Sequence, residues 1–298
     1  MKKSAFPIIG LVLLMYGGAV RGNAQADLRI AGTVYWEWAR MDAKASLVLA
    51  SAGLKLPTGR SQGEEIINME FPRLVRPYLM DLAVDSSSTL GDLIDRGEYG
   101  LSELHGIPAA AKRTAPALSP DFSMLTTNYG VDLRRIIASL VLHRNPIGTM
   151  STLLPVPSRT YTGIIIIADD TLPVHGKKTS ALGEPCFFPK IWDTQMNLVY
   201  ERNMVDPAAA KTRGIVRYVA RNRILRPTPS GLDAELIALV GEQPLRILAR
   251  GFFGVRPTDP IIDRADALTL ISLEENRRLL REGRVVLVLS GGALESSF

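Results

Sequence analysis

Four consecutive isoleucines, Ile164–Ile167, constrain the fold of this 298-residue chain more than any other feature. They lie within Tyr161–Ala168 (YTGIIIIA), and a run of branched apolar residues of this kind is typical of a strand buried on both faces. A second run, Arg284–Leu289 (RVVLVL), predicts another buried strand near the end of the chain. The protein must therefore contain a sheet with a well-covered central strand.

The order of the remaining elements predicts an α+β fold with mixed or antiparallel sheets and packed helices. Strands grouped before helices, with one closing strand, favour this class over strict βαβ winding. The predicted strands are Asp27–Trp38, Tyr161–Ala168, Met196–Glu201, Gly214–Ala220, Leu245–Ala249 and Arg284–Leu289. The predicted helices are Arg40–Ala52, Ser61–Met69, Leu74–Leu82, Leu90–Ile94, Val131–His143, Leu232–Val240, Asp263–Ile271 and Leu273–Arg281.

Four segments follow from this pattern. Residues 1–26 are a signal peptide, 27–150 an N-terminal α+β region, 160–290 a strand-rich C-terminal α+β domain, and 291–298 a flexible tail. The pattern leaves open whether the two folded regions form one domain.

The first 26 residues have the features of an export signal. Lys2 and Lys3 precede an apolar run from Ala5 to Val20, and small residues at Ala24 and Ala26 match a cleavage site. The run is short and Gly-rich for a membrane span, which needs about 20 apolar residues. We therefore expect cleavage before Asp27 and a periplasmic protein, with an uncleaved membrane anchor as the alternative.

The formal net charge of +5 belongs largely to this signal. Residues 1–26 hold three of the 35 Lys and Arg and no acidic residue, so 32 basic face 30 acidic side chains in the remainder, a net of +2. A near-neutral chain without a basic arm is not expected to bind nucleic acid.

One cluster of candidate metal ligands follows the isoleucine strand. Asp169 and Asp170 stand at its carboxyl end, a common position for a divalent-metal site, and His175 and Asp193 could complete the ligand set. The alternative is that the acidic pair simply begins a solvated loop. No cofactor is expected.

The single cysteine, Cys186, precedes Phe187 and Phe188, which indicates a buried loop in which the thiol is a small apolar group. No disulfide can form within the chain. Neither a G-x-S-x-G elbow nor a Walker loop occurs.

Five arginines lie close together after the strand near residue 217 and form a candidate contact surface for a partner, glycan or lipid headgroup. They are Arg213, Arg217, Arg221, Arg223 and Arg226. For Arg213 and Arg217, which would share one face of the strand, a solvated strand face is the alternative interpretation.

A succession of short motifs resembles a domain found in exported proteins and lipoproteins of two-membrane bacteria, related to flagellar disc and collar lipoproteins. The motifs are Tyr161–Gly163, Pro189–Asp193, Val199–Glu201, Gly241–Ala249, Ala265–Ala267 and the closing RVVLVL strand. The resemblance covers roughly residues 160–290 and implies a structural or assembly role in the envelope. It transfers no catalytic residue. The family often carries a lipid-modified Cys after its signal, whereas this chain has Ala26, so membrane contact is expected to be indirect.

We therefore expect an exported, non-enzymatic structural or assembly protein of the cell envelope, with association with the flagellar basal body as the narrower expectation. Its partners would be envelope or basal-body proteins, or a second copy of the chain. The alternatives are a metal-dependent periplasmic hydrolase and a glycan- or lipid-binding module.

Overall fold

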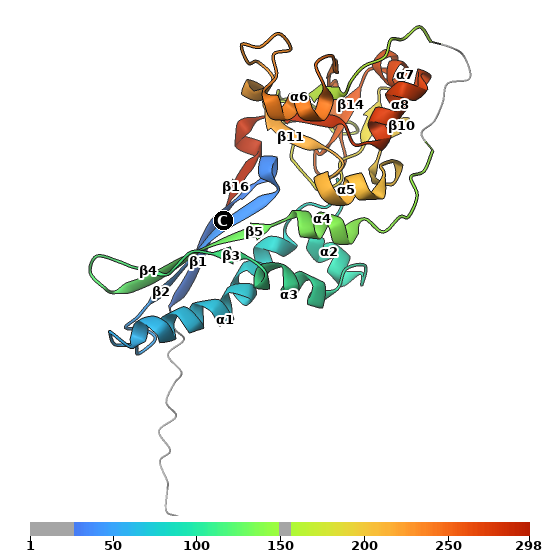
Figure 1. Ribbon diagram of the computed structural model, residues 1–298. Helices are drawn as coiled ribbons and strands as arrows, with labels where there is room; N and C mark the ends of the chain where they lie inside the picture. Colours follow the sequence, from blue (N-terminus) through green and yellow to red (C-terminus); the bar gives the residue numbers. More distant parts are fainter. Residues whose placement is uncertain (1–26, 149–155) are drawn as a thin grey trace, which may run out of the picture.

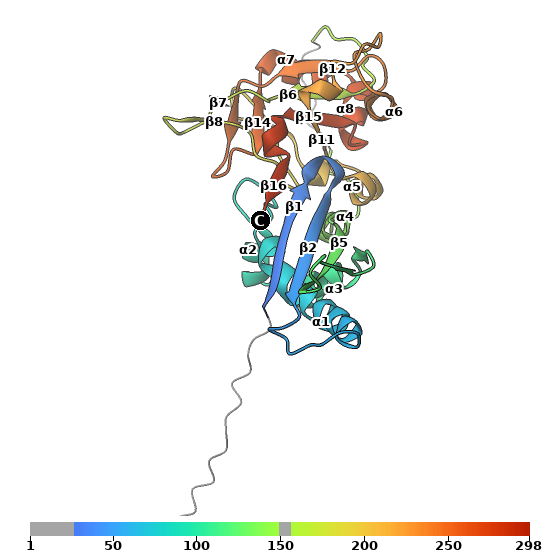
Figure 2. The ribbon, with the colours of Figure 1, turned by 90° about the vertical axis from the view of Figure 1, so that its left-hand side faces the viewer.

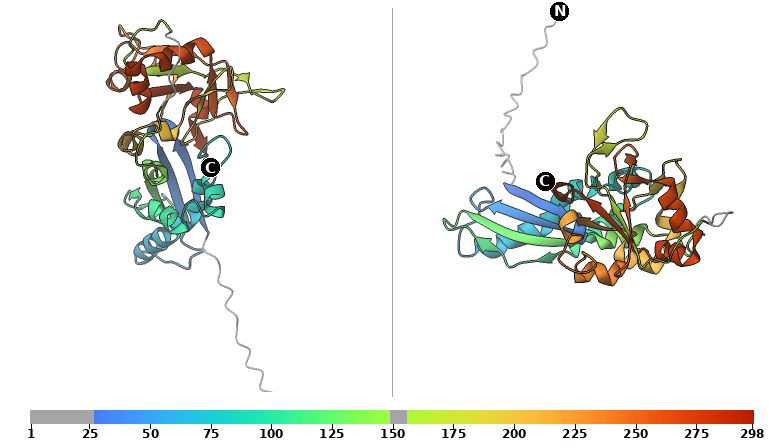
Figure 3. Two further views of the ribbon diagram at one scale, coloured as in Figure 1. Left: turned by 90° about the vertical axis from the view of Figure 1, so that its right-hand side faces the viewer. Right: turned by 90° about the horizontal axis from the view of Figure 1, so that it is seen from above.

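The computed structural model describes residues 27–148 and 156–298, so the expected signal peptide lies outside the described residues. Two lobes lie end to end (Figures 1 and 3), an N-terminal lobe around one sheet and a C-terminal lobe around two. The predicted α+β class is confirmed, with an antiparallel sheet in the N-terminal lobe and a mixed sheet beside a parallel one in the C-terminal lobe. Within the described ranges no helix has the length and apolarity that a bilayer crossing requires.

The N-terminal lobe contains an antiparallel sheet in the order β16-β1-β2-β5-β3, with β4 also beside β5. Its strands are β1 (Leu28–Tyr35), β2 (Arg40–Val48), β3 (Lys112–Arg113), β4 (Ala117–Leu118), β5 (Met124–Asp132) and β16 (Glu295–Ser297).

Strand β2 replaces the helix that the sequence predicts over Arg40–Ala52. Met41, Ala43, Ala45 and Leu47 are all buried, and the residues between them are not, which is the alternation of a half-buried strand. The alanines favour a helix locally, but β2 hydrogen-bonds to β1 on one side and β5 on the other. This pairing and burial outweigh the local preference.

Helix α1 (Gly59–Met80) covers one face of this sheet (Figure 1). It unites the two helices predicted on either side of Pro72. One stripe at a spacing of four residues faces the sheet, and Phe71 in this stripe stacks on Tyr129 at 3.7 Å between ring centroids. The buried stripe consists of Gly59, Gly63, Ile67, Phe71, Val75 and Leu79.

Three shorter helices complete the lobe: α2 (Leu90–Asp95), α3 (Leu101–Ala109) and α4 (Arg134–Leu140). The helix predicted over Val131–His143 is only partly present, because its first residues belong to β5. Val131 belongs instead to the alternating buried positions of β5, before the chain turns into α4.

The isoleucine strand is the central feature of the C-terminal lobe. Strand β6 (Ile164–Ile167) lies between β15 (Val285–Leu289) and β12 (Leu245–Leu248), and β11 (Arg217–Ala220) completes a parallel sheet. Ile165 packs into a small core that includes residues of α6 (Ala234–Val240), whereas its neighbours on the other face join the large core shared by both lobes. The prediction of a central strand buried on both faces is confirmed.

A second, mixed sheet in the order β10-β9-β14-β13 lies in the same lobe, and the hairpin β7–β8 projects from it (Figure 2). Their bounds are β7 (Leu172–Pro173), β8 (Ser180–Ala181), β9 (Ile191–Asp193), β10 (Leu198–Tyr200), β13 (Gly251–Phe253) and β14 (Asp259–Ile262). The remaining helices are α5 (Pro207–Arg213), α7 (Arg264–Ser272) and α8 (Glu274–Arg281).

The last residues of the chain return to the N-terminal lobe instead of forming the flexible tail expected over 291–298 (Figure 2). Strand β16 pairs with the edge of β1, where the backbone groups of β1 need partners. Phe298 stacks on Tyr78 of α1 at 4.1 Å between ring centroids. Both ends of the described chain thus contribute to one sheet.

The close approach of the chain end to β1 predicts opposite effects for two glycine substitutions. A Cβ at Gly32 would overlap the Asp42 carbonyl oxygen and the Phe298 ring, whereas a Cβ at Gly106 in α3 meets nothing within 4 Å. Gly32→Ala should lower the free energy of unfolding by about 1–3 kcal/mol through overpacking. Gly106→Ala should raise it by roughly 0.5–1 kcal/mol, because Ala is the better helix former. Urea unfolding measures both, and equal effects would contradict the packing of Phe298.

Candidate contact site at the junction of the two lobes

The tip of the β1–β2 hairpin carries the contact between the lobes. The 3-10 turn η1 (Trp36–Trp38) joins the two strands, and Ala39 closes it in the left-handed region, with φ of 47°. Trp36 is 8 % exposed and packs against Phe187 and Tyr218 of the other lobe, at ring-centroid distances of 5.3 and 6.4 Å. A buried aromatic cluster therefore fixes the hairpin on the C-terminal lobe.

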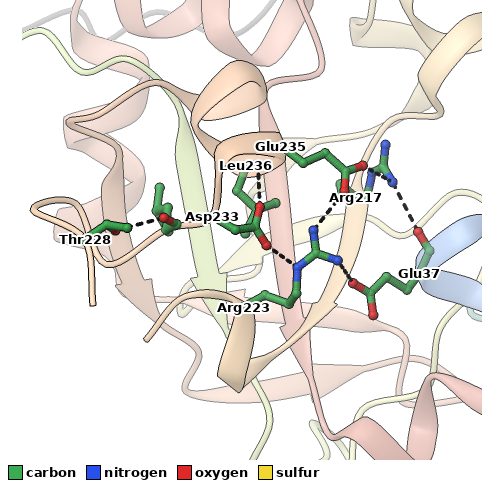
Figure 4. Close-up of polar contacts among 8 residues, drawn as sticks. Glu37, Arg217, Arg223, Thr228, Asp233, Glu235 and Leu236 are labelled. Carbon is green, nitrogen blue, oxygen red and sulfur yellow. Dashed lines mark hydrogen bonds and ion pairs between the residues drawn. The ribbon is translucent and has the colours of Figure 1, made fainter. Parts of the chain in front are cut away.

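Beside this cluster, Arg223 contacts three carboxylates (Figure 4). It lies in the turn η3 (Arg221–Arg223) after β11, and its side chain is 14 % exposed. It pairs with Glu37 of the hairpin and with Asp233, and its Nη2 lies 2.8 Å from Glu235. One guanidinium thus joins the N-terminal hairpin to the start of α6.

Arg217 on β11 extends this arrangement. Its Nη1 lies 3.1 Å from Glu235 and donates a hydrogen bond to the Glu37 carbonyl oxygen at 3.3 Å. Burial raises the pKa of the Glu37 carboxyl, and Arg223 opposes this effect only partly. Burial acts in the same direction on Asp233, but hydrogen bonds from Arg223 and the Leu236 amide lower the pKa of that carboxyl.

Cys186 lies under the aromatic cluster and is fully buried. Its amide donates to the Tyr218 hydroxyl at 3.1 Å, and that hydroxyl donates to the Cys186 carbonyl oxygen at 2.8 Å. Burial raises the pKa of the thiol, which keeps it protonated. Its environment is that of a small apolar core residue, as the two phenylalanines that follow it in the sequence indicate.

Asp259 is a buried carboxyl that the sequence does not single out, because Asp259-Pro260 resembles an ordinary turn. It accepts hydrogen bonds from the Lys190 amide at 3.1 Å and from Thr258 Oγ1 at 2.9 Å. Burial raises the pKa of this carboxyl. The Asp259 carboxylate thus links β14 to Lys190, the residue that precedes β9.

The structure does not bring the four candidate metal ligands together. Asp169 receives two hydrogen bonds from Arg221, which also lies 3.6 Å from Asp170. Asp193 is fully buried and is bound by Arg264 and by the amides of its own turn. The His175 ring lies 6.0 Å from that of Phe253. In the part of the chain that the structure describes, no three His, Cys, Asp or Glu side chains are placed to hold a metal ion.

The five arginines of the candidate contact surface are used mainly within the chain. Arg217 and Arg223 belong to the junction, Arg221 to the Asp169 pair, and Arg213 donates to the Glu282 carbonyl oxygen at 2.7 Å. Only Arg226 among the five forms neither an ion pair nor a side-chain hydrogen bond within residues 27–148 and 156–298. Instead it lines a hollow next to Trp38.

Trp38 is the exposed member of this region, with 48 % of its surface accessible. It borders a hollow of about 530 Å³ on the N-terminal lobe and another of about 490 Å³ towards the C-terminal lobe. The alternation of β1 could not show which tryptophan of η1 faces outward, because the 3-10 turn interrupts the period of two.

The geometry defines a two-lobed α+β protein whose acidic and basic side chains largely connect its own elements. Two family models match it: the N-terminal domain of Treponema pallidum Tp0624 over residues 27–140, and the second domain of the same protein over residues 163–291. No curated protein matches the chain. The matched ranges follow the two lobes in order, which points to a bacterial family built from these two domains.

The Arg223 contacts predict a large effect of one arginine substitution. Arg223→Ala would leave Glu37 and Asp233, whose side chains are 17 % and 22 % exposed, without their cation. We expect the free energy of unfolding to fall by about 2–3 kcal/mol, somewhat less than for a fully buried pair. The control Arg73→Ala breaks a pair on the exposed face of α1 and should cost less than about 0.5 kcal/mol. Similar losses in chemical unfolding would contradict a structural role for Arg223.

The raised pKa of Asp259 predicts a pH dependence of stability. Because the folded state retains a proton that the unfolded state releases above its usual pKa of 3.8, the contribution of this group to stability decreases as pH rises through the raised pKa. The free energy of unfolding of the protein, minus that of the Asp259→Asn variant, should therefore be largest near pH 4 and decline towards neutral pH. Urea unfolding across this range tests it, and a constant difference would contradict it.

Proposed function

We propose that the chain is a non-enzymatic structural or assembly protein of the bacterial cell envelope. The junction of the lobes supports this proposal most directly. Trp36, Arg223 and the returning strand β16 join the two lobes into one body. The candidate metal ligands Asp169 and Asp193 serve instead as ion-pair partners of arginines. Trp38 is exposed beside basic side chains, an arrangement that is typical of a surface that contacts a partner.

The proposed location rests on the sequence. The basic start, the apolar run and the small residues before Asp27 support export by a cleaved signal peptide. The narrower proposal, association with the flagellar basal body, rests on the succession of motifs over residues 160–290. Attachment to the membrane would be indirect, through a partner protein or a second copy of the chain.

The alternative of a metal-dependent hydrolase has no structural support, because Asp169 and Asp193 bind different arginines. A glycan- or lipid-binding module remains a second candidate, since Trp38 combines exposure with nearby cations. Which of these classes of partner the surface favours depends on its charge and shape.

Fractionation of the cells that produce the protein tests the proposal. We expect the native protein in the periplasmic or envelope fraction, beginning at Asp27 by N-terminal mass analysis. After crosslinking in intact cells it should migrate in a stable complex with other envelope proteins. A monomeric periplasmic enzyme treated in parallel controls for random crosslinking. Recovery of the protein as a lone monomer would overturn the proposed role.

A further inference from the structure

The hollow of about 530 Å³ beside Trp38 lies between strands that pair through their backbones. Arg40 at the start of β2 lies opposite Asp132 at the end of β5, and Lys112 of β3 lies opposite Gly130. Trp38 precedes β2, and α4 begins directly after β5. The walls of this hollow, which we call the Trp38 hollow, are therefore held in place by three paired strands and a helix start.

The Trp38 hollow has a cationic surplus. Its charged lining comprises Arg40, Asp42, Lys112, Asp132, Arg134 and Arg135. Each of the two carboxylates pairs with a neighbouring arginine, Asp42 with Arg40 and Asp132 with Arg134. Lys112 and Arg135 are exposed and form no ion pair among the described residues. The hollow thus presents a net charge of +2 from two free cations.

The hollow on the other side of Trp38 differs in sign. Its charged lining is Glu37, Arg223, Arg226, Asp233 and Glu295, a net of −1. Here Arg223 is already bound by carboxylates, and its guanidinium lies 5.4 Å from the centre of the Trp38 ring. An anionic partner is consequently attracted to the Trp38 hollow and not to its neighbour.

We propose that the Trp38 hollow binds an acidic, extended segment of a partner protein, an inference that rests on the proposed role as an assembly component. Carboxylates of the segment would pair with Lys112 and Arg135, and an apolar side chain would pack on Trp38. Exposed tryptophan beside arginine is the composition of energetically dominant interface residues.

The shape and the charge favour a peptide over the other anionic partners. The two free cations line a hollow with a volume of about 530 Å³. A few residues of an extended chain can enter this hollow, whereas a flat bilayer cannot. Two free charges are also far fewer than the row of phosphate contacts that sustains binding to nucleic acid.

Binding of a short fluorescein-labelled peptide of alternating Glu and Leu to the chain from Asp27 to Phe298 tests the inference. Lys112→Glu with Arg135→Glu should weaken binding at least about tenfold, and Trp38→Ala should do the same, the loss typical of dominant interface residues. The matched control is Lys55→Glu with Lys178→Glu, which makes the same charge change at exposed lysines elsewhere and should alter binding less than about twofold. Circular dichroism verifies that each variant is folded.

Three results would overturn the inference: no saturable binding of the peptide, equal weakening by both double variants, or preferential binding to phosphatidylglycerol vesicles or an anionic glycan. The crosslinked complex in cells separates this inference from the proposed function. A complex that persists in the Lys112→Glu, Arg135→Glu variant would reject the Trp38 hollow as the docking site and leave the assembly role standing. Absence of any complex with the unaltered protein would reject the assembly role itself.

Discussion

The burial of Trp36 against the C-terminal lobe is the interaction on which the arrangement of this protein depends. A hairpin tip would ordinarily lie in solvent, but here its indole packs against Phe187 and Tyr218. That contact places Glu37 beside Arg223 and leaves Trp38 outside. Because β16 also returns to β1, the lobes are joined at the hairpin tip and again along the sheet edge.

The ion pairs at this junction fix the relative orientation of the two lobes more than they add to the free energy of unfolding. A partly buried ion cluster contributes little net free energy, since desolvation offsets much of the attraction, but its geometry allows few alternatives. Arg223 can satisfy three carboxylates from two lobes only if the lobes keep one relative position. The surface around Trp38 lies next to this junction, so the fixed position of the lobes also keeps the shape of that surface constant.

Much of the fold could be predicted from local patterns, and the failures share one cause. The buried strand at Ile164–Ile167 and the helix ending at Val240 follow from runs and periodicity within a few residues. The strand at Arg40–Val48 and the ordered chain end do not, because each depends on a partner strand distant in sequence. The arginine cluster was visible as a charge pattern, yet only its carboxylate partners, up to 186 residues away, show that it is internal.

The sequence by itself determined the class of the fold, the central buried strand, the near-neutral charge beyond residue 26 and the features of an export signal. Each of these depends on composition or on spacing within a short window. The tertiary structure alone decided which tryptophan of the hairpin is buried, which arginines are free, and that Asp169 and Asp193 do not share a site. The reason is physical: burial and ion pairing depend on distances across the folded chain, and a linear pattern carries no such distances.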